Sequence, residues 1–259
     1  MITDFHNHLI PGVDDGAADA AESAAALATF HEQGVRTVVC TPHVSGALTA
    51  DPAALAARLA ELDRGWEALA AAASAHPAMR VVRGAEVMLD TPRPDLSDPR
   101  LRLGGTAFAL VEFPFMSVPP NAVEALFALR MQGWTPVLAH PERYANAAPD
   151  LHEAPEWKRV GALLQVNAGS LLGRYGPDAA RRGWGLVRAG LADYLCSDYH
   201  ARGRCPVASC RALMEERGYG EQARLLTEEN PARLLRGEAP LPVPPRQRSR
   251  PLWRRILGR

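Results

Sequence analysis

Two histidines close to the start of the chain have the spacing of a metal-binding pair. His6 and His8 lie in the segment Asp4-Phe5-His6-Asn7-His8, at the end of a predicted strand over 2–8. Side chains alternate between the two faces of a strand, so both imidazoles project from the same face. Two imidazoles held in this way at the end of a strand form half of a metal site.

The same chemistry recurs where later predicted strands end. Asp198 and His200 repeat the spacing of the first pair, and Glu86 stands inside an otherwise apolar segment. A carboxylate is rarely buried in such a segment unless it is paired or binds a metal ion. The other histidines, in a helix, a helix end and a loop, are expected to be solvated. The candidate ligands are His6, His8, Asp15, His43, Glu86, Glu112, His140, Asp198 and His200.

This donor set predicts more than one metal ion. Nine ligands exceed the needs of one tetrahedral site and suit two or three divalent ions that share carboxylates. Imidazole and carboxylate ligands without thiolate favour Mn²⁺, our first expectation, with Fe²⁺ or Zn²⁺ as alternatives. Four carboxylates against three divalent ions leave a net positive site, which attracts a phosphate dianion and promotes ionisation of bound water.

The elements that would position these residues alternate between strands and helices. Strands are predicted over 2–8, 35–40, 80–87, 108–112, 135–139, 163–167 and 194–196. Helices are predicted over 19–33, 52–74, 121–132 and 177–189, with two shorter ones near Asn230-Pro231. Such alternation indicates a parallel sheet. No glycine-rich turn follows the first strand, which disfavours an open nucleotide-binding sheet. We therefore predict an α/β fold, a distorted TIM-like (β/α)7 barrel, with the metal site at the carboxyl ends of its strands.

Composition limits the remaining possibilities. A length of 259 residues fits one barrel domain, and 47% hydrophobic residues can form a sizeable core. The net charge is zero, but residues 246–259 carry six arginines and no acid, so the rest of the chain is mildly acidic. That balance predicts no nucleic-acid partner. No apolar run could span a bilayer and no signal pattern begins the chain, so the sequence predicts a cytoplasmic protein with reduced cysteines.

The end of the chain differs in composition from the rest. We predict one domain over 1–238 and a tail rich in proline and arginine over 239–259, since five prolines preclude a long helix there. The segment Leu252-Trp253-Arg254-Arg255-Ile256-Leu257 mixes apolar and cationic residues. It could contact a membrane surface weakly or remain solvated.

Eight segments of this chain together resemble the polymerase and histidinol phosphatase (PHP) superfamily. They are DFHNHLIPGVDDGA, TPH, GAEV, EFPF, AHPER, QVNAGSLLG, SDYH and ENPARLL, and they extend over residues 1 to about 235. The resemblance is closer still to the bacterial tyrosine-protein phosphatases of the CpsB/CapC type. It implies metal ligation by the nine residues named above. For the third ligand near the N-terminus we favour Asp15, which directly precedes Gly16 as in the superfamily pattern, with Asp14 as the alternative.

The resemblance also implies an activity and its substrate. Such enzymes hydrolyse phosphotyrosine on a protein, here the tyrosine-rich C-terminal tail of a tyrosine kinase that controls capsule or exopolysaccharide synthesis. Arg143 of AHPER would hold the phosphate. The loop after SDYH is one residue shorter than the family pattern, so the second phosphate-binding arginine is Arg204 or, as the alternative, Arg202. Another PHP activity, such as histidinol-phosphate phosphatase, is the alternative function. The sequence predicts no oligomeric state.

A second phosphatase chemistry has a partial signature. The segment from Cys205 to Arg211 has the C-x₅-R spacing of the cysteine-dependent tyrosine phosphatases. That chemistry needs a cradle of backbone N–H groups around a thiolate of low pKa. The segment has no glycine, and Ala212 follows the arginine. We therefore expect this match to be accidental.

Overall fold

Apolar segments that are buried on both faces form the strands at the centre of the fold. The computed structural model describes residues 1–246 and confirms the α/β class, with every strand pair parallel. Its strands are β1 Ile2–Asp4, β2 Val35–Cys40, β3 His43–Ser45, β4 Arg80–Arg83, β5 Glu86–Met88, β6 Phe108–Glu112, β7 Thr135–Ala139, β8 Leu163–Asn167 and β9 Tyr194–Cys196. Five predicted strands (35–40, 108–112, 135–139, 163–167 and 194–196) have the observed bounds, because buried apolar runs leave the backbone little choice.

The strands belong to two sheets that are linked end to end. One has the order β1-β2-β4 and the other β3-β5-β6-β7-β8-β9. The chain passes from β2 to β3 through Thr41-Pro42 and from β4 to β5 through Gly84-Ala85, so the predicted strand over 80–87 is divided. Hydrogen bonds from Gly84 N to Cys40 O (3.0 Å) and from Glu86 N to Pro42 O (3.0 Å) bridge the interruption. Pro42 has no N–H to donate, which explains why the ladder breaks there.

The first and last strands come together at their carboxyl ends. The predicted strand over 2–8 is regular only as far as Asp4, and Asn7 then forms an isolated parallel bridge with Tyr199. His8 N donates to Tyr199 O (2.9 Å), and Asp198 N donates to His6 O (2.8 Å). These bonds bring the histidine pair of the N-terminus beside the late Asp-x-His pair.

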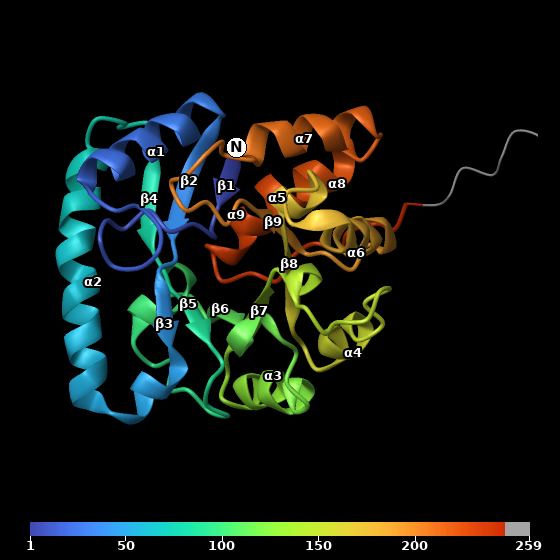
Figure 1. The fold of residues 1–259 in the computed structure, drawn as a ribbon, viewed down its shortest axis with the longest axis horizontal. Helices are drawn as coiled ribbons and strands as arrows, with labels where there is room; N and C mark the ends of the chain where they lie inside the picture. The colour runs from blue at the N-terminus through green and yellow to red at the C-terminus, as the bar shows by residue number, and fades with distance from the viewer. Residues whose placement is uncertain (247–259) are drawn as a thin grey trace, which may run out of the picture.

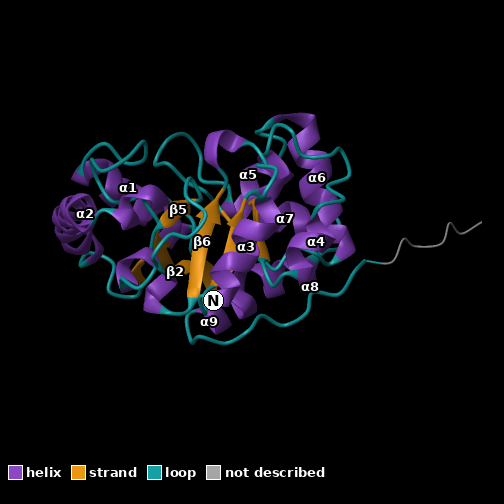
Figure 2. Ribbon diagram, turned by 90° about the horizontal axis from the view of Figure 1, so that it is seen from below, coloured by secondary structure: helices purple, strands orange, loops and turns teal. Residues whose placement is uncertain are grey.

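Helices surround the strands, as Figure 2 shows. The four long helices predicted from the sequence are present, and their ends follow from capping. Asp19 accepts hydrogen bonds from two backbone N–H groups at the start of α1, Asp51 does so for α2, and Gly190 ends α6 in a left-handed conformation. The helices are α1 Ala20–Glu32, α2 Pro52–Ala73, α3 Ala122–Met131, α4 Ala154–Arg159, α5 Ala168–Leu171, α6 Gly176–Ala189, α7 Val207–Glu216, α8 Gly220–Arg224 and α9 Asn230–Leu234 (Figure 1).

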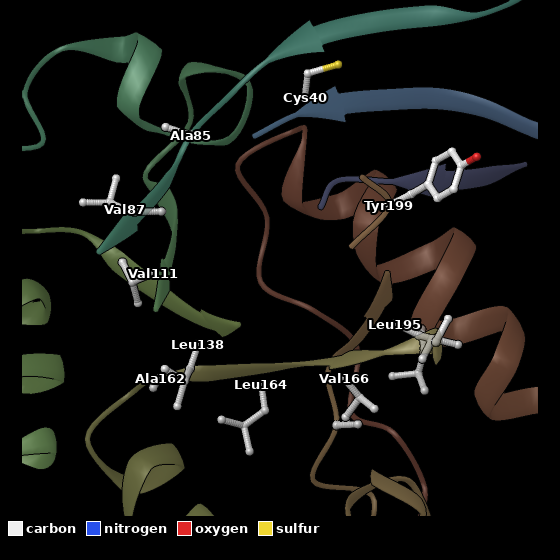
Figure 3. Close-up of a cluster of buried hydrophobic side chains, with 14 of the residues drawn as sticks. Cys40, Ala85, Val87, Val111, Leu138, Ala162, Leu164, Val166, Leu195 and Tyr199 are labelled. Carbon is white, nitrogen blue, oxygen red and sulfur yellow. The ribbon is translucent and has the colours of Figure 1, made fainter. Parts of the chain in front are cut away.

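Apolar side chains from the strands and helices form the core, part of which is drawn in Figure 3. Val87, Val111, Leu138 and Leu164 come from successive strands and are at most 1% exposed. They are far apart in the sequence, so this core forms only when the strands are assembled. It provides the rigid support on which the polar strand ends lie.

The last described residues have no helix or strand but pack against the body. Val243 is buried, Gln222 Nε2 donates to Pro244 O (3.2 Å), and Arg246 N donates to Arg188 O (2.9 Å). The predicted boundary after residue 238 stays a prediction. The cationic segment at 252–257 lies outside the described residues. Among residues 1–246, no helix is both long and apolar enough to cross a membrane.

Asp4 links the first strand to the last. It is 1% exposed and accepts hydrogen bonds from Asn7 Nδ2 (3.0 Å) and from Ser197 N (2.7 Å). Burial raises the pKa of this carboxyl to about 6, although both hydrogen bonds oppose the shift. The side chain therefore satisfies two donors that no water reaches.

We predict that Asp4→Ala lowers the free energy of unfolding by roughly 2–4 kcal/mol, because it leaves two buried donors without an acceptor. Urea denaturation of chelator-treated protein measures this without a contribution from bound metal. Asp178→Ala, which removes an exposed carboxylate of α6, is the control and should change stability by less than about 0.5 kcal/mol. Equal effects of the two substitutions would contradict the role given to Asp4.

Candidate metal centre

Glu86 contacts four imidazoles in the interior of the protein. Its Oε2 lies 3.1 Å from His6 Nε2, 3.4 Å from His8 Nε2 and 3.2 Å from His43 Nδ1. Its Oε1 lies 3.1 Å from His140 Nε2. The glutamate is 1% exposed at the start of β5, so its charge is separated from water. The structure therefore brings together imidazoles from three separate strand termini, those of β1, β3 and β7, around one carboxylate.

Asp198 approaches the same centre from the end of β9. Its Oδ1 lies 3.3 Å from His6 Nε2 and 3.4 Å from His8 Nε2. Its Oδ2 accepts hydrogen bonds from Arg143 Nη1 and from Asn167 Nδ2, the latter at 2.9 Å. One oxygen thus faces the histidines while the other holds an arginine.

A more exposed group lies beside this buried one. Asp15 Oδ1 is 3.5 Å from His43 Nε2 and 3.4 Å from His200 Nε2, and its side chain is 64% exposed. Glu112 Oε1 is 3.2 Å from His43 Nδ1, and Glu112 Oε2 is 3.9 Å from His140 Nε2. His43 therefore has a carboxylate near each ring nitrogen and connects the inner group to the outer one.

Asp14 and Asp15 occupy different environments. Asp14 Oδ2 lies 2.9 Å from His8 Nδ1 and accepts from His43 N (3.2 Å), while Oδ1 accepts from Gly16 N (3.0 Å). Its oxygens are thus engaged by the protein, whereas Asp15 points toward two imidazoles. This geometry supports Asp15 as the ligand and Asp14 as the residue that orients His8.

Hydrogen bonds also fix the orientation of other rings. His6 Nδ1 lies 2.8 Å from Gln165 Oε1, while Gln165 Nε2 donates to Val166 O (2.8 Å). The amide oxygen can only accept, so His6 carries its proton on Nδ1 and directs Nε2 toward the centre. His200 Nδ1 lies 3.0 Å from the backbone oxygen of Asp198, which directs its Nε2 toward Asp15 in the same way.

The residues fit divalent metal ions. The structure contains four sets of three or four potential ligands. Within each set the ligand atoms all lie within 4.8 Å of one another, and the four sets together contain all nine predicted ligands. His6 Nε2, His8 Nε2 and Glu86 Oε2 are buried and make no hydrogen bond within the described structure. Buried polar atoms are costly without a partner, and a cation among them would satisfy all three.

The charges of the centre explain its protonation in the protein alone. Burial disfavours the charged form of His6, but Glu86 and Asp198 outweigh it and raise the pKa of the imidazole to about 9. Burial opposes the charged form of His8 as well, but Asp14, Asp198 and Glu86 outweigh it and raise the pKa of this imidazole well above its usual range. Burial opposes ionisation of Asp14 as well, but His8 prevails and lowers its pKa to about 2. Protonated histidines therefore balance the charge of the ionised carboxylates at neutral pH. Metal ions that bind must displace these protons from the imidazoles.

Backbone strain is present at two of these residues. His140 (φ 35°), directly after β7, and Asp198 (φ 51°), two residues after the end of β9, adopt left-handed conformations. This region is unfavourable for residues with a β-carbon and costs on the order of 1–3 kcal/mol each. The strain turns both side chains from the strand direction toward the centre.

Arg143 is held from three sides. Its guanidinium bonds to Asp198 and lies over the Tyr175 ring, 4.1 Å from the ring centre. The loop that carries it is clamped by Arg182 of α6, which is 9% exposed. Arg182 donates to the backbone oxygens of Tyr144 (3.0 Å), Ala147 (2.6 Å), Ala148 (3.1 Å) and Glu142 (3.4 Å).

The other two predicted arginines lie on an exposed loop. A cavity of about 100 Å³ next to His200 is lined by Arg202 and Arg174, and Arg204 is not part of its lining. Arg204 contributes its backbone oxygen, which accepts from Arg174 Nη1. The geometry thus supports the alternative Arg202 more than our first choice, Arg204.

Cys205 and Arg211 do not form a phosphate cradle. Cys205 is 1% exposed, and burial raises the pKa of its thiol to about 12. Arg211 bonds to Thr227 and pairs with Glu228 (2.8 Å). A protonated buried thiol cannot act as a nucleophile at neutral pH, so the C-x₅-R spacing is accidental in this fold.

Sequence reasoning missed several supporting residues, namely Gln165, Asn167, Tyr175 and Arg182. Gln165 and Asn167 lie within the segment QVNAGSLLG, and two polar side chains at alternate positions of an apolar strand were a usable signal. Arg182 gives no such signal, because an arginine in an amphipathic helix is ordinarily solvated.

Comparisons with known proteins show which family this chain is similar to. A profile of the family described as capsular polysaccharide synthesis, CpsB/CapC, matches residues 2–236. Tyrosine-protein phosphatase YwqE of Bacillus subtilis (strain 168) is 30% identical over 256 residues, which cover 98% of this chain and 98% of YwqE. Tyrosine-protein phosphatase CpsB of Streptococcus agalactiae serotype III is 27% identical over 178 residues, 65% of this chain and 68% of CpsB.

Solved structures give the same relationship. One solved structure superposes on this chain with a TM-score of 0.77 at 30% identity. It is described as one of the structures of YwqE from Bacillus subtilis and CpsB from Streptococcus pneumoniae, "unique metal-dependent tyrosine phosphatases". The superposition covers 96% of this chain and 100% of the chain in that structure. A phosphotriesterase from Mycobacterium tuberculosis shares the fold, with a TM-score of 0.52 at 12% identity over 93% of this chain and 95% of its own.

We predict that Gln165→Leu weakens metal binding by roughly 10–100-fold, because the His6 ring loses the acceptor that fixes its tautomer. Competition with a fluorescent chelator measures the affinity. Gln132→Leu, at the exposed end of α3, is the matched control and should bind metal as the unmodified protein does. Unchanged affinity in the Gln165 variant would show that the hydrogen bond does not position His6.

We also predict that Cys205→Ser leaves kcat/KM on a phosphotyrosine peptide within about twofold, since a protonated thiol takes no part in the chemistry. Cys210→Ser, which changes another buried cysteine, is the control. Loss of turnover only in the Cys205 variant, with its metal content intact, would point to a covalent cysteine mechanism instead.

Proposed function

The chain belongs to the CpsB/CapC family of capsular polysaccharide synthesis, and from this premise we propose that it is a metal-dependent protein-tyrosine phosphatase. The observation that carries the proposal is the cluster of five imidazoles and four carboxylates, Glu86 among them, with Arg143 bonded to another of those carboxylates. The relatives named tyrosine-protein phosphatase support the same activity.

The proposed site lies at the carboxyl ends of a seven-stranded distorted barrel. β2 with β3 and β4 with β5 each act as one interrupted strand, and the hydrogen bonds between the ends of β1 and β9 support closure. Two or three divalent ions, with Mn²⁺ the first expectation, would be held by His6, His8, Asp15, His43, Glu86, Glu112, His140, Asp198 and His200. When bound, such ions polarise a phosphoryl group and make water a better nucleophile at neutral pH.

The residues of the chain position the phosphate. Arg143 uses one N–H on Asp198 and keeps other donors of its fork for the equatorial phosphate oxygens. Stacking on Tyr175 and the clamp from Arg182 restrict its movement, so little ordering is required when the substrate arrives. Arg202 or Arg204 on the neighbouring loop would supply the second guanidinium.

The leaving group suits a site without a dedicated acid. A tyrosine phenol has a pKa near 10, so the departing oxygen needs less protonation than an alkoxide would. The substrate we propose is a phosphotyrosine protein, the C-terminal tail of a tyrosine kinase in capsule or exopolysaccharide synthesis. The family description and the tyrosine phosphatases among the relatives support this assignment.

We predict that Arg143→Ala lowers kcat/KM on a phosphotyrosine peptide by roughly 10²–10³-fold, since it removes a preorganised donor for the transition state. Arg202→Ala should lower it more than Arg204→Ala, because only Arg202 lines the cavity. Metal content, measured by mass spectrometry, separates a loss of phosphate binding from a loss of metal. Arg181→Ala, an exposed arginine of α6, is the control.

Chelation and substrate choice test the proposal itself. Chelator treatment should abolish turnover, and Mn²⁺, Co²⁺ or Zn²⁺ should be compared for its recovery. Full activity after complete metal removal would disprove a metal-dependent mechanism. Faster hydrolysis of histidinol phosphate than of phosphotyrosine peptide would favour the other PHP activity.

A further inference from the structure

A cavity at the rim of the metal centre contains one arginine, Arg174, to which the proposed chemistry gives no role. It has a volume of about 100 Å³ and lies between the turn before α6 and the loop after β9. Arg174 and Tyr175 line it from the turn, and Tyr199, His200 and Arg202 line it from the loop. Asp198 is the one carboxylate in this lining, and its oxygens already face His6, His8, Arg143 and Asn167.

The guanidinium of Arg174 has no acidic partner within residues 1–246. Many arginines of the protein pair with a carboxylate, as Arg83 does with Asp63 and Arg211 with Glu228. Among the described residues, neither Arg174 nor Arg202 has such a partner within 4.0 Å. The one hydrogen bond of the Arg174 side chain goes to the backbone oxygen of Arg204, which leaves most of its N–H donors available.

The cavity adjoins the proposed phosphate position, because Tyr175 and Asp198, which both contact Arg143, also line it. Tyr175 stacks on Arg143. Arg174 directly precedes Tyr175 in the chain, so the α-carbons of Arg174 and Tyr175 are about 3.8 Å apart. An extended peptide advances by about 3.3 Å per residue. A residue one or two positions from a bound phosphotyrosine can therefore reach the cavity.

We propose that Arg174 binds a second anionic group of the substrate next to the phosphotyrosine, while Arg202 remains available to the phosphate itself. This inference rests on the proposed phosphatase activity and adds a substrate preference to it. The ligand is a carboxylate or phosphate on a neighbouring residue, because a guanidinium group without an acidic partner offers paired N–H donors to planar or tetrahedral oxyanions. Arg174 is then a specificity-determining residue outside the catalytic centre.

Peptides that differ at one position test the proposal. Each carries a phosphotyrosine with Glu, Gln, Lys or a second phosphotyrosine two residues away, and p-nitrophenyl phosphate serves as a substrate without a neighbour. The metal-loaded protein should favour Glu over Gln by about tenfold in kcat/KM, mainly through KM, as one partly exposed charge-assisted hydrogen bond allows. Comparison of the Glu and phosphotyrosine arms identifies the source of the anion.

Arg174→Ala should abolish this preference and leave turnover of the Gln peptide and of p-nitrophenyl phosphate within about twofold. Arg174→Lys should retain part of it, and the control Arg181→Ala all of it. An equal loss on every substrate would overturn the inference, since Arg174 would then act only through the Arg204 loop. The absence of any Glu preference in the unmodified protein would overturn it as well.

Binding measurements distinguish this inference from the proposed function. Peptides with a non-hydrolysable difluorophosphonate in place of phosphotyrosine, titrated by calorimetry, should bind about tenfold more tightly with Glu than with Gln. If the analogues bind with this preference but no phosphotyrosine substrate is hydrolysed, the phosphatase proposal fails and the anion site stands. If substrates are hydrolysed but the two analogues bind equally, the anion site fails and the phosphatase stands.

Discussion

The buried carboxylate of Glu86 imposes the central constraint on this protein. A charge that is 1% exposed must be compensated, because moving an unpaired carboxylate out of water is prohibitively costly. Four imidazoles provide the compensation, and they come from three separate parts of the sheets: His6 and His8 after β1, His43 at the start of β3, and His140 after β7. The sheets therefore have to be assembled in one register before the charge can be buried.

The rest of the centre shows how rigidity is distributed around that charge. Gln165 and Asp14 fix the rings of His6 and His8, and left-handed backbone at His140 and Asp198 turns those residues inward. Farther out, the arginines at 174, 202 and 204 lie on exposed turns without acidic partners among residues 1–246. A preorganised interior with an adaptable rim suits a site that binds one fixed group and a variable peptide around it.

Residues of the same type have different chemistry in different surroundings. Arg143 keeps N–H donors free beside the metal centre, whereas the guanidinium of Arg211 is paired with Glu228 and bonded to Thr227. Cys205 has the sequence spacing of a catalytic cysteine, but burial raises the pKa of its thiol to about 12. Burial and partners, rather than spacing, decide which of these residues can react.

The sequence by itself determined the alternation of strands and helices, the bounds of the long buried strands, and the nine polar residues that follow strand ends. These features arise from local periodicity and from residue types that are rarely buried without a partner. Tertiary structure alone decided that Asp14 orients His8, that Gln165 orients His6 across 159 positions, and that Arg182 holds the Arg143 loop. It also divided the strand predicted over 80–87 and placed Arg202 rather than Arg204 at the cavity. Each of these outcomes depends on hydrogen bonds or contacts between segments that meet only in the folded chain, and local pattern carries no information about them.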